Sequence, residues 1–149
     1  MKAKLVAGGT TVTYVVVFGE GEEAFSALTD WAASEQLSAA QVTAVGAFER
    51  ATVGWFDRAA RDYRRIEIDQ QCEVLSLLGD IVIGADGGEP PRPQPHLHAV
   101  LGLSDGTTRG GHLLEGHVWP TLEMVVRETP AQLRKTHRPD VGLALIDLD

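Results

Sequence analysis

Histidine is concentrated in one short part of this sequence. Four of the five histidines fall within residues 96–117 of a 149-residue chain, far more than an even spread would place there: His96, His98, His112 and His117. Imidazole is the commonest metal ligand among side chains, and it also serves as a general acid or base near neutral pH. The sequence therefore predicts that its chemistry lies in this stretch.

The spacing of His96 and His98 is typical of two side chains on one face of a β-strand. They flank Leu97, at the start of an apolar run over residues 97–103. Since side chains two residues apart on a strand point to the same face, the two imidazoles are expected to project together. Leu97 then faces the other side of the strand.

A tight turn is expected to bring His112 to the same place. Asp105-Gly106 lies between the apolar runs 97–103 and 109–114, and Asp-Gly between such runs favours a β-hairpin. The second run then returns beside the first, with His112 in the neighbourhood of His98 or His96. Gly110 and Gly111 leave room for a close backbone approach or a bulge at this point.

Three imidazoles that converge from two paired strands predict a metal site at His96, His98 and His112. Catalytic zinc typically has three protein ligands and keeps the fourth position for water or substrate. The expected ion is Zn²⁺ or another divalent metal that accepts imidazole, such as nickel, iron or cobalt. The alternative is that these histidines are partly exposed strand residues that bind nothing.

Two other kinds of metal site are excluded, and two histidines are expected to lie elsewhere. A cupin site also opens with His-x-His, but it needs a glutamate where residues 100–103 here are Val, Leu, Gly and Leu. One cysteine, Cys72, cannot supply the thiolates of a zinc finger. His117 would face the opposite side of an unbroken strand, and His137 is expected in a surface turn before Pro139.

The carboxylates near the cluster leave the catalytic residues unknown. Glu73 lies in the apolar strand-like run 72–75, where an acid is either exposed or paired. If it is buried, it is a candidate to orient a ligand imidazole or to act as a base on bound water. Glu115 and Glu123 are similar candidates. No Ser-His-Asp motif, phosphate-binding loop or dinucleotide fingerprint is present, so no cofactor-binding residues are predicted.

Composition disfavours several classes of partner. The formal net charge is −8, which disfavours direct binding to nucleic acid, because affinity for phosphates comes from Lys and Arg. The longest strongly apolar run, residues 14–18, is far shorter than the ~20 residues of a membrane span. A lone cysteine and the lack of an apparent export signal predict a cytoplasmic protein. The basic stretch Arg58, Arg61, Arg64 and Arg65 is expected to be a solvated face or an anion-binding patch.

The pattern along the chain predicts one domain, residues 1–149, of α+β class. One helix is expected from Glu22 to Ala32, with Trp31 on its core face, and a long loop over residues 84–95. The expected architecture is a central, largely antiparallel (mixed) β-sheet packed against that main helix. The expected strands are residues 11–18, 42–48, 51–56, 63–68, 72–83, 97–103, 109–114, 121–126 and 141–146.

The order of short motifs along the chain is also informative. They are Val45-Gly46-Ala47-Phe48, the run from Glu73 to Gly79, Pro95-His96-Leu97-His98, Asp105-Gly106, Gly110-Gly111-His112-Leu113 and Thr121-Leu122-Glu123. This order resembles that of the plants and prokaryotes conserved (PPC) domain, a family listed as a domain of unknown function. The resemblance covers roughly Thr13 to Glu128. It implies an α+β fold assembled as a homotrimer, with His96, His98 and His112 at the family's metal-site positions and zinc as the expected ion.

The sequence departs from the plant members of that family. In plants the domain follows AT-hook segments and mediates protein contacts, whereas prokaryotic members are usually the domain alone. This chain has no Arg-Gly-Arg-Pro AT-hook, and it reads Gln71-Cys72-Glu73-Val74 where the plant form has Gly-Arg-Phe-Glu. Direct DNA binding, although a label often given to the family, is therefore not expected here.

The function expected from the sequence is a homotrimer that binds a divalent metal and an unidentified small-molecule ligand or substrate. Whether it is an enzyme is left open. The alternative is a non-enzymatic module that presents a surface to another protein.

Overall fold

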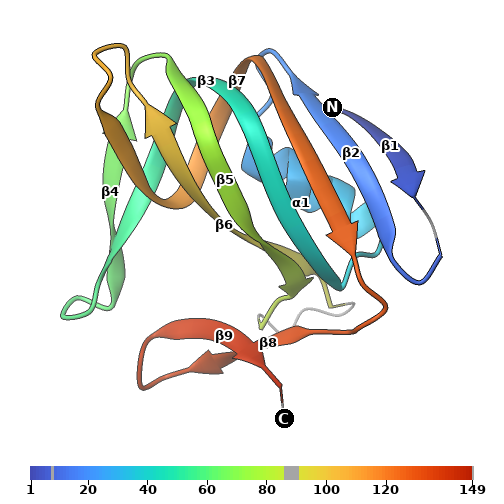
Figure 1. Cartoon of the computed structure of the whole chain (residues 1–149). Coiled ribbons are helices and arrows are strands. Elements are labelled where there is room, and N and C mark those ends of the chain that lie inside the picture. The colour runs from blue at the N-terminus through green and yellow to red at the C-terminus, as the bar shows by residue number, and fades with distance from the viewer. Residues whose placement is uncertain (8, 86–90, 149) are drawn as a thin grey trace.

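The chain folds mostly into β-sheet, with one short helix (Figure 1). A computed structural model describes residues 1–7, 9–85 and 91–148. Runs rich in Val, Ile and Thr form most of the strands, as their branched side chains fit a pleated surface. Within the described residues the elements are β1 (Lys2–Ala7), β2 (Val12–Gly19), α1 (Ala24–Ser34), β3 (Ala39–Asp57), β4 (Asp62–Ile68), β5 (Cys72–Ile83), β6 (Pro93–Gly102), β7 (Thr108–Glu128), β8 (Arg134–Arg138) and β9 (Leu143–Asp147).

The strands form one curved sheet, and four of them pair with one another in a closed ring. The order β1-β2-β7-β3-β5-β8-β9 makes up the main path, and β4 pairs with β3. Because β6 pairs with both β5 and β7, and β3 also pairs with both, the strands β3, β5, β6 and β7 form a closed ring of ladders. These ladders are antiparallel, while β5 and β8 meet in a single parallel bridge. The sheet is therefore mixed and largely antiparallel, as predicted.

Two long, bent strands carry this ring. β3 pairs with β5 through its first half and with β4 through its second half, and β7 runs beside both halves. The register of β3 shifts around Gly46, which has a φ of +151°. A Cβ at Gly46 would lie 2.3 Å from the carbonyl oxygen of Thr121, so only glycine allows this close approach.

Several predicted boundaries are corrected by the structure. Residues 42–48 and 51–56 belong to one strand, β3, and residues 109–114 and 121–126 both belong to β7. Each of these strands changes its pairing partner along its length and continues through polar residues. In the sequence, such polar residues look like the end of one strand and the start of another. β1 and β8 were not predicted, and β8 contains His137, which was expected in a turn.

The predicted loop over residues 84–95 is also shorter than expected. β6 begins at Pro93, and residues 86–90 lie outside the described part of the chain. Pro93 and Pro95 are tolerated because β7 pairs only with residues 98–102 of β6. The start of β6 therefore pairs with β5 alone and is an edge on its β7 side, a place where proline is tolerated.

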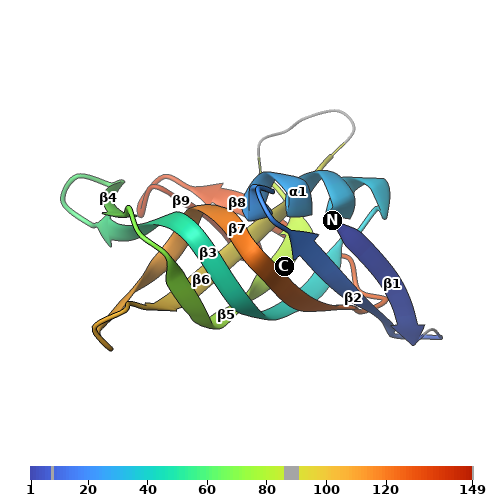
Figure 2. The same cartoon turned by 90° about the horizontal axis from the view of Figure 1, so that it is seen from above.

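The helix lies against one face of the sheet (Figure 2). It starts and ends two residues later than predicted, and its core face carries Leu28, Trp31 and Ala32. Trp31 is 7% exposed and meets the Tyr14 ring edge-on at 5.2 Å, which confirms its predicted place in the core. The described chain is richer in strand than the predicted α+β class implies. It contains no helix long and apolar enough to cross a membrane.

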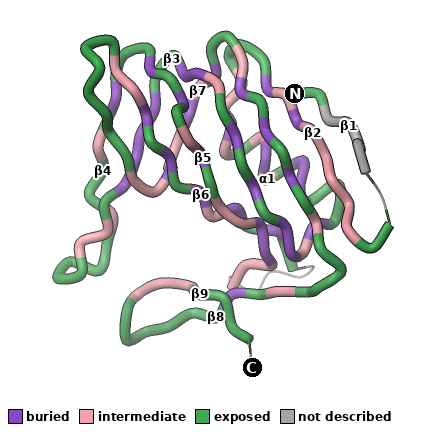
Figure 3. The backbone as a smooth tube through the Cα atoms, viewed as in Figure 1, coloured by how far each residue is buried: buried purple, intermediate pink, exposed green. Residues whose placement is uncertain are grey.

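Burial alternates along the central strands, so the sheet has a core face and an exposed face (Figure 3). The exposed face carries large apolar side chains on four neighbouring strands, and we call this set the apolar sheet face. Val45, Leu75 and Leu78 are the most exposed of them, at 56%, 55% and 55%. The full set is Val45, Leu75, Leu78, Val100 and Val125.

Glu23 joins the helix to the sheet, which gives a first prediction. Its carboxylate accepts hydrogen bonds from the N–H groups of Phe25 and Ser26 in the first turn of α1 and from Gly116 of β7. Glu23→Ala leaves these donors without their acceptor, and we expect it to lower the free energy of unfolding by about 1–2 kcal/mol. Urea unfolding measures this. Glu20→Ala, at an exposed position, should change it little, and equal effects of the two substitutions would contradict the assignment.

Candidate metal centre

The hairpin between β6 and β7 has the turn that the sequence predicts. Gly106 has a φ of +79°, and the N–H of Leu103 donates to the carbonyl oxygen of Thr107 at 2.8 Å. Asp105 accepts from the N–H of Thr107 with its side chain at 2.9 Å. The turn therefore fixes the register in which β7 returns along β6.

That register places His98 directly opposite His112. His96 and His98 alternate with the buried Leu97 and Ala99, which confirms that the two imidazoles share a face of β6. Directly paired residues of antiparallel strands have side chains on the same face, so His112 joins them.

The three rings form a nearly equilateral triangle. Their centroids are 5.1 Å apart for His96 and His98, 5.2 Å for His96 and His112, and 5.4 Å for His98 and His112. One ring nitrogen from each lies within 4.8 Å of the others, close enough to hold a metal ion. The Nε2 atoms of His96 and His98 are 3.2 Å apart. A tetrahedral zinc with Zn–N bonds of about 2.0–2.1 Å separates its ligand nitrogens by roughly 3.3 Å.

The backbone around His112 is unusually crowded. A Cβ at Gly111 would lie 2.5 Å from the carbonyl oxygen of Gly54 on β3, which confirms the close approach expected before His112. His112 itself pairs with Gly54, and Tyr63 of β4 stacks on its ring at 4.8 Å with an interplanar angle of 21°. The plane of the His112 ring is thus fixed by packing.

Asp80 is the site residue that the sequence reasoning missed. It lies opposite His96 in the β5–β6 ladder, and its Oδ2 is 3.5 Å from Nδ1 of His96. Its other oxygen, Oδ1, is 3.8 Å from Nζ of Lys135 on β8. A carboxylate beside Nδ1 favours a proton on that nitrogen, so Nε2 keeps its lone pair for a metal. Only the pairing of β5 with β6 reveals Asp80, and a single sequence does not contain that register.

Burial favours the neutral form of His98 and His112. Desolvation, followed by the nearby His96 and His98, lowers the pKa of His112 from 6.5 to about 4. Burial and His96 also lower the pKa of His98, against the opposing effect of Asp80. Neutral rings carry the lone pairs that a metal needs.

Two buried polar atoms of this site have no hydrogen-bond partner among the described residues: Nδ1 of His112 and Oδ1 of Asp80. A buried polar atom without a partner is costly. A metal ion held by the three histidines is a partner that a neutral imidazole nitrogen binds well. The three imidazoles therefore fit a divalent metal.

The other predicted candidates lie apart from this cluster. Glu73 is exposed and pairs with Gly102, several residues along the ladder from His98. Glu123 is exposed opposite Val45, and His137 is exposed on β8. The structure therefore does not bring Glu73 to the histidines, and the acid beside them is Asp80.

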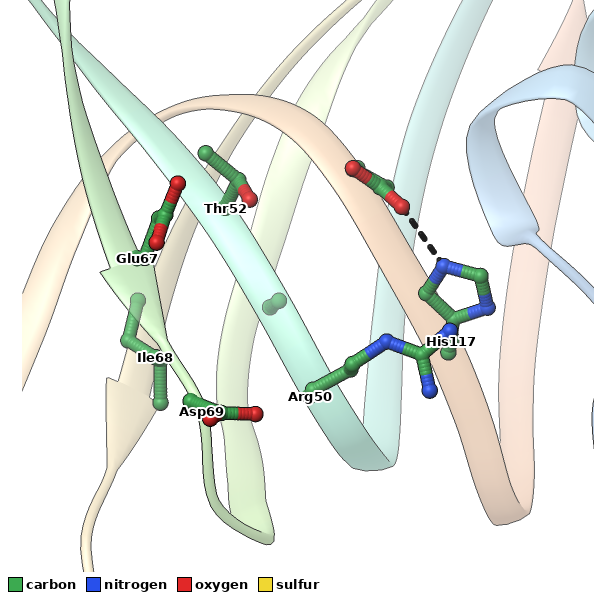
Figure 4. A pocket seen from close by; sticks show the side chains of 8 residues that line it. Arg50, Thr52, Glu67, Ile68, Asp69 and His117 are labelled. Carbon is green, nitrogen blue, oxygen red and sulfur yellow. Dashed lines mark hydrogen bonds and ion pairs between the residues drawn. The ribbon is translucent and has the colours of Figure 1, made fainter.

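His117 belongs to a different pocket (Figure 4). Its Nε2 lies 2.6 Å from Oε1 of Glu115, and the pocket of about 290 Å³ is also lined by Arg50, Thr52 and Glu67. This placement agrees with the expectation that His117 stands outside the metal site.

A second cavity, of about 210 Å³, opens directly beside the histidines. His96 and His112 form part of its wall, and the β8–β9 hairpin contributes Lys135 and Leu143. The remaining lining residues are Phe25, Tyr63, Gln94, Pro95, Ala144 and Leu145.

Comparison with known proteins identifies a family. The sequence model of the Plants and Prokaryotes Conserved (PCC) domain matches residues 6–130. No curated protein sequence matches the chain.

Solved structures share the fold over nearly the whole chain. A plant- and prokaryote-conserved (PPC) protein from Pyrococcus horikoshii is 26% identical with a TM-score of 0.82, over 98% of this chain and 94% of that one. A protein from Bacteroides thetaiotaomicron, described as a candidate DNA-binding protein, is 25% identical with a TM-score of 0.84, over 97% and 96%. A metal-containing protein from Archaeoglobus fulgidus is 23% identical with a TM-score of 0.80, over 97% of both chains.

The low pKa of His112 predicts a pH-dependent stability of the metal-free protein. As the pH falls from about 6.5 to about 4, the unfolded chain binds the proton before the folded one, so the stability present above pH 6.5 is progressively lost. Because His112 is partly exposed, we expect a loss of about 1–2 kcal/mol after screening by water. Urea unfolding in a chelating buffer measures it.

The control for this experiment is the same substitution at two histidines. His112→Asn should reduce the dependence between about pH 6.5 and 4 and leave the contribution of His98, whereas His137→Asn, at an exposed position, should retain it in full. An unchanged slope in His112→Asn would show that another group is responsible.

Proposed function

The chain belongs to the Plants and Prokaryotes Conserved domain family, and we propose that it is a homotrimer in which each subunit binds one divalent metal ion. His96, His98 and His112 would hold the ion, with zinc as the expected metal. The observation that carries this proposal is the triangle of three imidazoles. The Nε2 atoms of His96 and His98 lie 3.2 Å apart, and one ring nitrogen from each of the three histidines lies within 4.8 Å of the others. Metal content in the Archaeoglobus fulgidus protein is consistent with it.

The chain's own residues prepare the site. Asp80 orients His96, and the Tyr63 ring holds the plane of His112. When bound, a divalent ion acts as a Lewis acid towards an oxygen atom of a ligand and lowers the pKa of bound water. Three protein ligands leave a position for such a molecule, which is why we include a small-molecule ligand or substrate in the proposal.

Metal binding is tested with protein purified without a histidine tag. We expect about one equivalent of zinc per chain by elemental analysis, as three converging imidazoles provide a site. His98→Ala should reduce this to well under half. Added zinc should also raise the melting temperature of the wild type, because a ligand that binds only the folded state stabilises it.

His117→Ala is the matched control for metal binding. It removes one imidazole of the same strand-rich region while leaving the cluster intact, so zinc content should not change. A wild type that contains no zinc and takes up none when it is added would overturn the proposed function.

The homotrimer is supported by the apolar sheet face. Leu78 of β5 and Val125 of β7 lie on either side of Thr43 of β3, and Val45 follows two residues along β3 on the same face, opposite Glu123. The three apolar side chains are all more than 40% exposed in the single chain. Contiguous exposed apolar side chains mark interaction surfaces. Further copies of this chain, as the family resemblance implies, are the occupants we propose.

Val45→Lys tests this assembly. A charge buried in a subunit interface is costly, so we expect the substitution to convert a trimer into monomers, measured by light scattering coupled to size exclusion. Val141→Lys places the same charge on an exposed valine outside the apolar sheet face and should leave the mass at three times that of one chain. A wild type that is monomeric at micromolar concentration contradicts the trimer.

A second candidate function is a non-enzymatic interaction module. Trp55 on β3 is 52% exposed, and the guanidinium of Arg64 lies over its ring at 5.0 Å. Trp and Arg are enriched at the centres of protein interfaces. Turnover of a small molecule that His112→Ala abolishes would favour the metal-dependent function over this one. Direct DNA binding is not proposed, because the net charge is −8.

A further inference from the structure

We propose that the cavity beside the histidines binds a small monocarboxylate with an apolar tail. The carboxylate would lie between the metal position and Lys135, and the tail against Phe25 and the β8–β9 hairpin. This inference rests on the proposed function, since it assigns a ligand class to the same metal site.

Lys135 gives the cavity its positive charge. The residue is only 8% exposed, although lysine is almost never buried unless it is paired. Its ion-pair partner among the described residues is Asp80, whose Oδ1 is 3.8 Å from Nζ. This separation is too long for a hydrogen bond, and Asp80 Oδ1 indeed has none. The ammonium group therefore retains donors for a ligand in the cavity that it lines.

The charge balance of the site favours an anion only when a metal is present. Lys135 and Asp80 offset each other, and an imidazole that binds a metal through its lone pair carries no charge. A divalent cation then leaves the site with a net positive charge. An anion that contacts both the metal and Lys135 restores the balance, and a carboxylate has two oxygens to do so.

The rest of the cavity wall is mostly apolar. Phe25, Tyr63, Leu143 and Leu145 line it. At about 210 Å³ the cavity is smaller than the roughly 300–1,000 Å³ of sites for drug-sized ligands. It therefore suits a tail of a few carbon atoms rather than a sugar or a nucleotide.

The β8–β9 hairpin is fixed over the histidine end of the sheet by a few contacts. β8 pairs with β5 only at Ile83 and Arg134. At its other end, Arg61 of the β3–β4 turn donates a hydrogen bond to the carbonyl oxygen of Pro139 at 3.2 Å. These contacts hold the hairpin beside the cavity, to which it contributes Lys135 from β8 and residues 143–145 from β9.

The pocket at His117 lacks this combination. There Arg50 is accompanied by three acids, Glu67, Asp69 and Glu115, so acidic side chains outnumber basic ones of fixed charge (Figure 4). Its basic residue, Arg50, is exposed, and none of its lining residues belongs to the histidine triangle. This contrast makes Arg50 a useful control residue.

Butyrate is the probe, tested by calorimetry on the zinc-loaded protein. We expect it to bind about tenfold more tightly than acetate, because the tail buries two further methylenes, and more tightly than the uncharged butyramide. Lys135→Met should weaken butyrate binding by about tenfold or more without changing the zinc content. Arg50→Met should leave both unchanged.

A second variant addresses the case in which Lys135→Met is poorly folded. Ala144→Phe fills the cavity from the β9 strand, and it should abolish butyrate binding while zinc binding and the melting temperature persist. Zinc binding without butyrate binding, or equal binding of butyrate and butyramide, would overturn this inference and leave the proposed function intact. Failure to bind zinc at all would overturn both.

Discussion

The pairing of β6 with β5 on one side and with β7 on the other is the constraint on which the rest of the structure depends. It closes the ring of β3, β5, β6 and β7 and so fixes the register of each strand against two neighbours. His98 lies opposite His112 through one ladder, and Asp80 lies opposite His96 through the other. The histidine triangle is therefore a property of the closed sheet, and no loop has to order for the three rings to meet.

The parts of the site that could be predicted from the sequence are those set by short-range rules. Strand periodicity puts His96 and His98 on one face, and the Asp105-Gly106 turn returns His112 beside them. Both rules act within about twenty residues, so a single sequence is enough. The helix and most of the strands are predictable for the same reason, since their patterns are local.

The parts that could not be predicted depend on contacts between distant segments. Asp80 and Lys135 meet His96 only because β5 pairs with β6 and β8 then joins β5. The sequence predicts two strands in place of β3 and two in place of β7, because a bent strand that changes its pairing partners leaves no continuous periodic pattern. The start of β6 was hidden by Pro93 and Pro95, which an edge tolerates and a central strand does not.

The β8–β9 hairpin lies at a boundary that matters for how the family name is used. The family model ends at residue 130, so it contains the three histidines and Asp80 but neither Lys135 nor the apolar residues of β9. The match to the family model therefore includes the histidine cluster but not the residues of the β8–β9 hairpin that line the cavity. Two chains that match the family model equally well can therefore differ in the residues that line this cavity. A ligand that is assigned to one member can be assigned to another only after their C-terminal segments have been compared residue by residue.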